Sequence, residues 1–202
     1  MKHAIIVAHP NVDSFNLSMA RAYQTAAEAV GDAVVLRDLY RLAFDPRLAL
    51  GELPRPQGFA PRADMVAERA MIGDADVFVF VYPLMFDSPP AMLKGYLERV
   101  FGMGFGFGTG QNGNAPLLHG RSMISLSSSG GPKTWLEQSG DWAALCKLFD
   151  EHFAAACGLS VLDHLHFGGI APGITPESVD QCRSQVKAMV KRHFDKAGQS
   201  AA

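Results

Sequence analysis

Hydrophobic residues form one unbroken run near the middle of the chain, from Val77 to Pro83 (VFVFVYP). Six consecutive apolar or aromatic residues without alternation are typical of a strand that is buried on both faces of a parallel sheet. Pro89 and Pro90 follow, and they suit the first turn of a helix because proline fixes φ. Apolar residues then recur at mostly helical spacing as far as Phe101. The pattern predicts a strand, a loop and a helix.

Short apolar runs and helical periodicities alternate along the rest of the chain. Strands are expected at Ala4–Ala8, Ala33–Leu39, Ser122–Ser128 and Leu159–Phe167. Helices are expected at about Ser14–Val30, Arg62–Ile72 and Asp141–Ala156, and the last one starts after Pro176 and ends near Lys196. Repeated strand–helix units favour an α/β fold with a parallel sheet. The proline-rich connection from Phe44 to Pro61 is expected to cross the surface. We expect one domain over residues 1–202.

Composition and charge exclude several classes of protein. The chain has 202 residues with 48% hydrophobic content, which is enough for a substantial core. With 18 basic and 20 acidic residues it has no electrostatic footprint for nucleic acid. No stretch has the apolar length of a signal core or a transmembrane segment. Cys146, Cys157 and Cys182 show no metal-site spacing, so we expect no metal and a reduced, cytoplasmic setting.

The first strand-to-helix turn is a candidate anion site. It reads HPNVDSFN, from His9 to Asn16. A helix amino terminus offers free backbone N–H groups and a positive dipole end, so it can hold a phosphate without much basic charge. Ser14 and Asn16 can add side-chain donors. The same segment also fits a simpler interpretation, in which Ser14 only caps the helix and His9 is bonded locally.

A second candidate loop follows the predicted strand at Ser122–Ser128. It reads SSSGGPKTW, from Ser127 to Trp135. Two adjacent glycines let the backbone approach a planar ring and present N–H groups to it. Such donors can stabilise negative charge that develops on the ring. A pair of glycines after a strand also occurs in ordinary turns, so the residues alone leave both interpretations open.

Three segments together resemble one family. The pattern PLxxxxxPAxLKGxxERVF begins at Pro83, AHxxxxSFN begins at Ala8, and Ser128–Gly131 stands where the family has TTGG. These segments are similar to those of the NAD(P)H:quinone oxidoreductases of the flavodoxin-like fold. The resemblance implies a three-layer sandwich with a five-stranded parallel sheet in the order 2-1-3-4-5 and helices on both faces. It also implies a homodimer with the active site at the interface.

The resemblance implies a flavin site as well. The residues expected to contact the flavin's phosphate chain are His9, Ser14, Phe15 and Asn16. The ring would lie between two sets of residues, Pro83, Leu84, Met85 and Phe86 on one side and Ser128, Ser129, Gly130 and Gly131 on the other. Ser129, Gly130, Gly131 and Trp135 are the expected catalytic residues. The resemblance favours FAD, although FMN is compatible with the same residues.

The implied reaction is hydride transfer from NADPH or NADH to the flavin, followed by delivery of two electrons to a quinone-like acceptor. Azo and nitro compounds are further acceptors, and one shared pocket implies ping-pong kinetics. The chain departs from the family at Phe86-Asp87, where many members have a Trp and a second aromatic residue, and it has no histidine between Gly131 and His152. Two other functions therefore stay open: a flavin-binding ancillary or regulatory subunit of a potassium efflux system, and a flavin-binding module with little turnover.

Other motifs are interpreted as structural. Gly108, Gly110 and Gly113 fit GxGxxG but follow a predicted helix, so we expect a pliable loop whose Phe105 and Phe107 cover the site or a partner subunit. His164 and His166 alternate on a predicted strand and should face one side. Glu98 and Arg99 are expected to form an exposed pair on a helix.

Overall fold

The computed structural model describes residues 1–53, 58–110 and 113–195, and its centre is a sheet of five parallel strands. The strand order is β2-β1-β3-β6-β7, which is 2-1-3-4-5 among the five and confirms the order that the resemblance implied. The strands are β1 (Lys2–Val7), β2 (Ala33–Asp38), β3 (Val77–Pro83), β6 (Ser122–Ser128) and β7 (Ser160–Phe167). All five lie within two residues of their predicted ranges.

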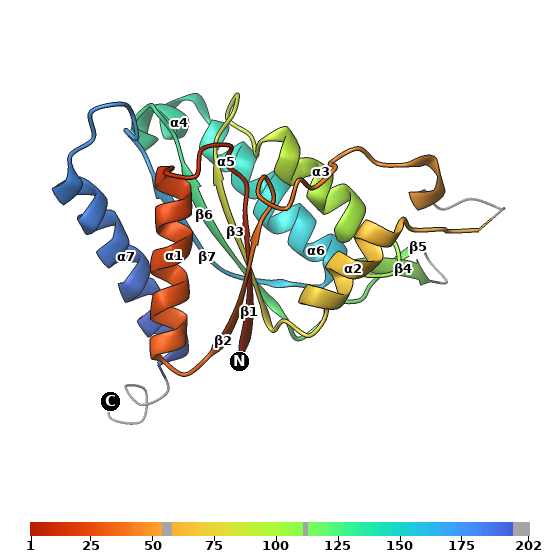
Figure 1. Ribbon diagram of the computed structural model, residues 1–202. Coiled ribbons are helices and arrows are strands. Elements are labelled where there is room, and N and C mark those ends of the chain that lie inside the picture. The colour runs from red at the N-terminus through yellow and green to blue at the C-terminus, as the bar shows by residue number, and fades with distance from the viewer. Residues whose placement is uncertain (54–57, 111–112, 196–202) are drawn as a thin grey trace.

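Helices cover both faces of this sheet (Figure 1). One face carries α1 (Phe15–Ala29) and α7 (Pro176–Phe194). The other carries α2 (Ala63–Ile72), α3 (Ala91–Val100), α5 (Asp141–Leu145), the π-helix η2 (Cys146–Phe153) and α6 (Ala154–Cys157). The predicted helix Asp141–Ala156 is thus present in three segments. Two short helices were not predicted, the 3-10 helix η1 (Leu50–Glu52) and α4 (Lys133–Ser139). Within the described ranges, no helix is both long and apolar enough to cross a bilayer.

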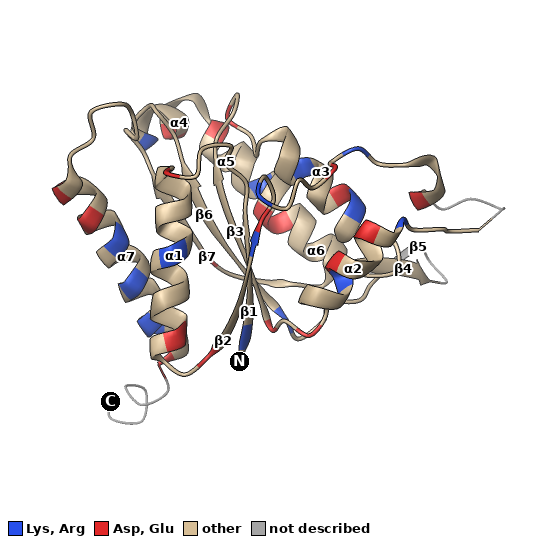
Figure 2. Ribbon diagram, viewed as in Figure 1, with Lys and Arg blue, Asp and Glu red and all other residues tan. Residues whose placement is uncertain are grey.

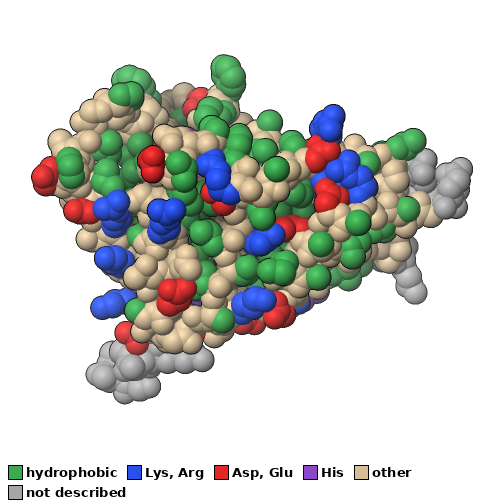
Figure 3. Space-filling model, viewed as in Figure 1, with side chains coloured by type: hydrophobic (Ala, Val, Ile, Leu, Met, Phe, Trp, Pro, Cys, Tyr) green, Lys and Arg blue, Asp and Glu red, His purple; other side chains and the backbone are tan. Residues whose placement is uncertain are grey.

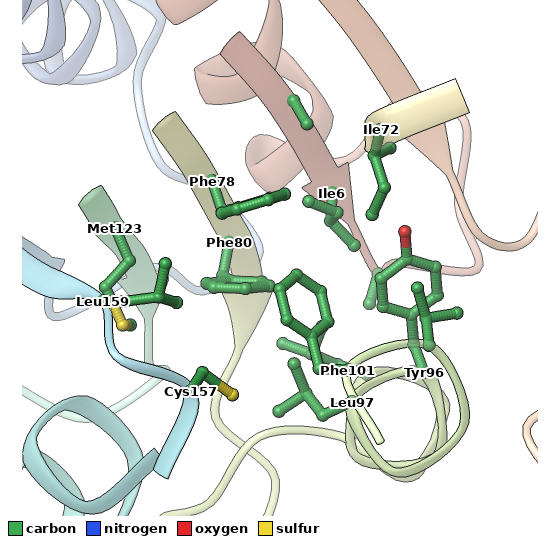
Figure 4. Close-up of a cluster of buried hydrophobic side chains, with 14 of the residues drawn as sticks. Ile6, Ile72, Phe78, Phe80, Tyr96, Leu97, Phe101, Met123, Cys157 and Leu159 are labelled. Carbon is green, nitrogen blue, oxygen red and sulfur yellow. The ribbon is translucent and has the colours of Figure 1, made fainter. Parts of the chain in front are cut away.

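Strand β3 divides the core into two clusters. Val77, Val79 and Val81 face α1 and α7, whereas Phe78 and Phe80 face the helices on the other side. This alternation is the two-residue period of a strand, and every side chain from Val77 to Tyr82 is buried. Figure 4 shows the second cluster, in which Phe78 and Phe80 point toward Phe101 of the segment after α3. The prediction of a strand buried on both faces is confirmed.

The glycine-rich segment after α3 differs from its prediction. Strand β4 (Phe107–Gly110) pairs antiparallel with β5 (Gly113–Pro116), so part of the expected loop is a hairpin. Phe105 packs edge-on against Phe101, with ring centroids 5.4 Å apart, and belongs to the margin of the core. Phe105 thus packs against adjacent core aromatics, and the expectation that Phe105 and Phe107 cover the site or a partner subunit stays a prediction.

Arg99 also differs from its prediction, since it is buried. Only 1% of the residue is exposed, and its Nη2 and Nε groups donate to both carboxylate oxygens of Glu52, at 2.7 and 2.9 Å. Its Nη1 donates to Asp64 at 2.9 Å, and its guanidinium lies 5.1 Å from the ring of Phe44. Hydrogen bonds from Arg99 hold the pKa of Glu52 below its ordinary value. The proline-rich connection is therefore anchored in the interior through Glu52.

Replacing Arg99 tests this anchor. Arg99→Ala leaves the buried carboxylate of Glu52 without its partner, and we expect the free energy of unfolding to fall by about 3–5 kcal/mol. Lys94→Ala on the same helix is the matched control, because Lys94 pairs with Glu98 on the surface and the loss should stay below about 1 kcal/mol. Urea denaturation of the three proteins measures both changes. Equal losses in the two variants would contradict the anchor.

Candidate functional site

Three loops meet at the carboxyl edge of the sheet, where backbone hydrogen bonds continue beyond the strands. The Ala8 N–H donates to the Val81 carbonyl at 3.0 Å, and the Leu84 N–H donates to the Ser128 carbonyl at 2.7 Å. On the other side of β6, the Ser129 N–H donates to the Phe167 carbonyl at 2.9 Å. These bonds place the loops after β1, β3 and β6 beside one another. Each of these loops follows a strand that the sequence predicted.

The first loop presents donors at the start of α1. Ser14 caps the helix, with its Oγ accepting from the Leu17 N–H at 3.1 Å. Within the described residues, the Phe15 and Asn16 N–H groups have no hydrogen-bond acceptor, as expected for a first helical turn. His9 accepts from the Asn11 N–H through Nδ1 at 3.0 Å, and burial lowers the pKa of His9. The neutral ring therefore carries its proton on Nε2, which can still donate.

Asn16 ties the first loop to the third. Its side chain is buried, and its Oδ1 accepts from the Ser128 hydroxyl at 3.2 Å. Phe15 packs edge-on against Phe167 at the end of β7, with ring centroids 5.3 Å apart. Both residues were predicted to contact a cofactor. Here the Asn16 Oδ1 and the Phe15 ring hold the loops together, and the backbone N–H groups of both residues have no acceptor within the described residues.

The second loop is a tight turn from Met85 to Ser88. Each of these two residues donates its N–H to the other's carbonyl, at 2.8 and 3.2 Å. Phe86 and Asp87 between them adopt φ of 51° and 55°, a left-handed conformation that costs about 1–3 kcal/mol for each such residue. The turn leaves the Phe86 ring fully exposed. A strained turn that holds an aromatic ring in solvent indicates a binding surface.

The third loop carries the two glycines. A Cβ on Gly131 would lie 3.0 Å from the Trp135 ring, so a side chain there would require that ring to shift by a few tenths of an ångström. A Cβ on Gly130 would meet only the Ile170 carbonyl at 3.9 Å, which leaves that face open. The Ser129 hydroxyl donates to the Gly131 carbonyl at 2.7 Å and tightens the loop. The N–H groups of Gly130 and Gly131 have no acceptor within the described part of the chain.

A hollow of about 380 Å³ lies between the second and third loops. Asp87 borders it on one side, and Ser129, Gly131 and Trp135 border it on the other. The free glycine N–H groups lie in the loop that forms this wall, and the free N–H groups of α1 lie in the neighbouring loop. The residues present therefore fit a flat ring between two loops and an anionic tail at α1, which is the arrangement a flavin requires.

A basic hollow of about 440 Å³ lies beside the first loop, between α1 and α7. Arg21, Arg183 and Lys187 line it together with Ser14 and Ser18. Arg183 donates through Nε to the Ser18 hydroxyl at 2.8 Å. Basic side chains gather over these two helices in Figures 2 and 3. The sequence analysis missed this hollow because its two sides are far apart in the chain and neither contains a run of basic residues.

Behind the third loop, side chains of β6, β7 and η2 form a polar cluster. Ser127 bonds both His164 and His166, which confirms that the two histidines face one side of β7. Asp150 of η2 accepts from the Ser125 hydroxyl at 2.8 Å and bonds His164 at 2.6 Å. The sequence analysis missed Asp150, because it was expected only as part of a helix.

The ligand atoms of Cys146, Asp150 and His164 all lie within 4.8 Å of one another, a grouping that could hold a metal ion. His164 and Asp150 are already bonded to each other, however. Burial, and then the Asp150 carboxylate, raise the pKa of Cys146 to about 11, so the thiol is protonated at neutral pH. Cys146, Cys157 and Cys182 are all free thiols in this structure.

Comparison with known proteins gives consistent similarities. A family model described as "Flavodoxin-like fold" matches residues 1–190. An uncharacterized NAD(P)H oxidoreductase of Haemophilus influenzae is 32% identical over 84% of this chain and 85% of its own length. NAD(P)H dehydrogenase (quinone) 1 of Cavia porcellus is 28% identical over 95% of this chain and 75% of its own. The crystal structure of an FMN-dependent NADH-azoreductase from Bacillus anthracis superposes with a TM-score of 0.73 and 20% identity, over 96% of this chain and 99% of that one.

Proposed function

This chain belongs to the flavodoxin-like fold family, with NAD(P)H oxidoreductases among its relatives, and from that premise we propose that it is a flavin-dependent NAD(P)H oxidoreductase. NADPH or NADH would be the hydride donor, and a quinone-like, azo or nitro compound would be the acceptor. One observation carries the proposal. The hollow between the Met85–Ser88 turn and the Ser129–Gly131 loop has unpaired backbone donors in its wall and an anion site beside it.

Each predicted residue has a role in this proposal. The flavin's phosphate would be held by His9 Nε2–H, by the Ser14 region and by the N–H groups of Phe15 and Asn16. Backbone groups of Pro83, Leu84, Met85 and Phe86 would border one edge of the ring, and those of Ser128, Ser129, Gly130 and Gly131 the other. When bound, a flavin accepts hydride and passes on two electrons.

The glycine N–H groups would stabilise negative charge at the ring edge, because they are fixed in place before the reaction. Trp135 would cover the nicotinamide, since its exposed side chain stands at the rim of the hollow. Donor and acceptor would occupy this hollow in turn, since both must reach the same ring. Such alternation gives ping-pong kinetics.

The basic hollow supports FAD over FMN. An FMN phosphate needs only the amino terminus of α1, whereas FAD adds a second phosphate and an adenosine. The hollow beside Ser14 offers about 440 Å³ and the cations of Arg21, Arg183 and Lys187 for that extension. Arg183 also pairs with Asp180 at 2.6 Å, which leaves Arg21 and Lys187 as the cations best placed to meet phosphate.

Exposed apolar side chains support a homodimer with the site at its interface. Phe86 is fully exposed, and Trp135 and Leu148 are largely exposed around the same end of the sheet. A soluble protein that exposes several large apolar groups together presents an association surface. A second copy of the chain would cover Phe86 and close the hollow against water.

The proposal is tested first on the purified protein. We expect a visible flavin spectrum, loss of its colour on anaerobic addition of NADPH, and return of the colour on addition of a quinone. Gly130→Val should lower flavin affinity at least about tenfold, because its side chain would occupy the open face against which the ring lies. Its thermal stability without flavin should be unchanged, since Gly130 has no positive φ and no close neighbour. A protein that binds neither FAD nor FMN would refute the proposal.

The choice of flavin is tested on the basic hollow. In the double variant Arg21→Gln/Lys187→Gln we expect the Kd for FAD to rise about tenfold, since two charges that face the second phosphate are lost, and the Kd for FMN to stay constant. Fluorescence titration of the apoprotein measures both constants. Lys191→Gln, on the same helix outside the hollow, is the control and should change neither. A parallel loss of FMN affinity would place the cations at the first phosphate instead.

The dimer is tested by sedimentation equilibrium, with an expected mass of twice the 21.8 kDa of one chain. Phe86→Ser should weaken association at least about tenfold, because it removes a large apolar group from the interface. Val161→Ser, an exposed apolar residue near the opposite end of β7, should leave association intact. A monomeric wild-type protein would refute the proposed homodimer.

A further inference from the structure

The polar cluster behind the third loop reaches from a buried carboxylate to the wall of the hollow. We propose that the side chains of Asp150, His164, Ser127, His166 and Ser129 form a proton relay that delivers one proton into the hollow at Ser129 Oγ. This inference rests on the proposed function, because it concerns the same hollow. It assigns these residues the task of supplying the proton that two-electron reduction of an acceptor consumes.

The relay is a continuous chain of hydrogen bonds. From the interior outward, Asp150 Oδ2 lies 2.6 Å from His164 Nδ1, and His164 Nε2 lies 2.7 Å from Ser127 Oγ. Ser127 Oγ lies 2.8 Å from His166 Nδ1, and His166 Nε2 lies 3.0 Å from Ser129 Oγ. Every link has hydrogen-bond length, and every intermediate group can both accept and donate a proton. Ser129 borders the hollow, so the chain ends where substrates would bind.

The hydrogen bond from Ser129 to Gly131 determines where the protons lie in the outer half of the relay, from Ser127 to Ser129. The Ser129 hydroxyl donates to the Gly131 carbonyl, which can only accept. Ser129 Oγ must therefore accept from His166 Nε2–H. A neutral His166 then has a free lone pair on Nδ1, so Ser127 donates its hydroxyl proton there. Burial lowers the pKa of His166 to about 4, with smaller contributions from His164 and Lys133, so this ring is neutral at pH 7.

The inner half of the relay, Asp150 and His164, then holds one proton more than an ionised carboxylate and a neutral imidazole would. Because Ser127 has given away its only proton, it accepts from His164 Nε2–H. A neutral His164 would then direct a lone pair at an oxygen of Asp150 only 2.6 Å away, which is repulsive if Asp150 is ionised. A proton must lie between these two groups. Asp150 and His164 are thus a proton store at the interior end of the relay.

The surroundings keep water away from this store. The Asp150 side chain is 5% exposed and that of His164 6%. The centre of the Trp142 ring, on α5, lies 4.7 Å from that of His164 and 5.3 Å from that of His166. Nζ of Lys133, on α4, lies 4.3 Å from the centre of the Trp142 ring. The other titratable groups that face the store are Tyr82 of β3 and Cys146 of η2, and burial raises the pKa of both. The hydrogen-bonded route from the store to the hollow runs through Ser127, His166 and Ser129.

The relay would supply the second proton that reduction of a quinone requires. Reduction of a quinone to a hydroquinone takes one hydride, which supplies two electrons and one proton, and one additional proton. Ser129 gives its hydroxyl proton to the acceptor oxygen, and His166 Nε2–H, Ser127 O–H and His164 Nε2–H each move one bond outward. The proton between His164 and Asp150 remains on Nδ1 and bonds the carboxylate. All donors then point in the reverse direction, and a proton that enters from water at Ser129 resets them.

The positions of the protons along the relay can be tested without any cofactor. Nitrogen-15 NMR of the imidazoles in the apoprotein should show neutral His166 with its proton on Nε2. His164 should carry a proton on Nε2 and a strongly deshielded proton shared between Nδ1 and Asp150. A His166 ring protonated on Nδ1 would mean that Ser129 donates inward and that the store is empty. That result would overturn the relay and leave flavin binding untouched.

The function of the relay is tested by cutting it at Ser127, which has no part in the proposed flavin contacts. With flavin bound, Ser127→Ala should bleach with NADPH at the wild-type rate. Reoxidation by a quinone should slow by about 10²-fold and lose its sensitivity to D₂O, because the general acid is disconnected. Ser122→Ala, at the other end of β6, is the matched control.

Two results would overturn the function of the relay, namely equal slowing of both half-reactions and an unchanged rate of reoxidation. Failure of the protein to bind flavin is a different outcome, since it refutes the proposed oxidoreductase while the proton order remains measurable by NMR. Should Ser127→Ala fold poorly, His164→Gln interrupts the same relay one residue closer to Asp150. Its rates of bleaching by NADPH and of reoxidation by a quinone are then measured in the same way.

Discussion

Three backbone hydrogen bonds hold the candidate site together, because they continue the sheet past the last residues of its strands. They join Ala8 to Val81, Leu84 to Ser128, and Ser129 to Phe167. Strand β3 is buried on both faces, so its position in the centre of the sheet is fixed by two apolar clusters. The loops that carry the free N–H groups are therefore fixed relative to one another by the sheet itself. A site built this way needs little rearrangement when a ligand binds.

Features that depend on neighbours in the sequence were predictable. The run VFVFVYP is the doubly buried strand that its unbroken apolar pattern predicted, and Ser14 caps α1 as its position before a helical pattern indicated. The paired glycines at 130 and 131 follow β6 as expected, and the contact of Gly131 with Trp135 explains one of them. Strand order followed from the resemblance, because spacing alone does not fix which strands become neighbours. The roles of the predicted site residues toward a flavin remain predictions.

Features that depend on distant partners were not predictable. Arg99 stands in an amphipathic pattern that suits solvent, but Glu52, almost fifty positions earlier, draws it inside. The same holds for Asp150, whose partners Ser125 and His164 belong to two different strands. The hairpin β4–β5 was hidden because its glycine-rich strands lack an apolar alternation. In each of these cases the sequence shows a polar or flexible residue, and only the fold shows which residues it contacts.

The position of Asp150 depends on the π-helix η2. Each of its turns contains about one residue more than an α-helical turn, and Asp150 and Cys146 lie on it close to His164. An insertion of one residue is enough to turn an α-helical segment into a π-helical one, and a deletion reverses the change. Whether the Asp150 carboxylate reaches His164 of β7 thus depends on a single residue in this segment.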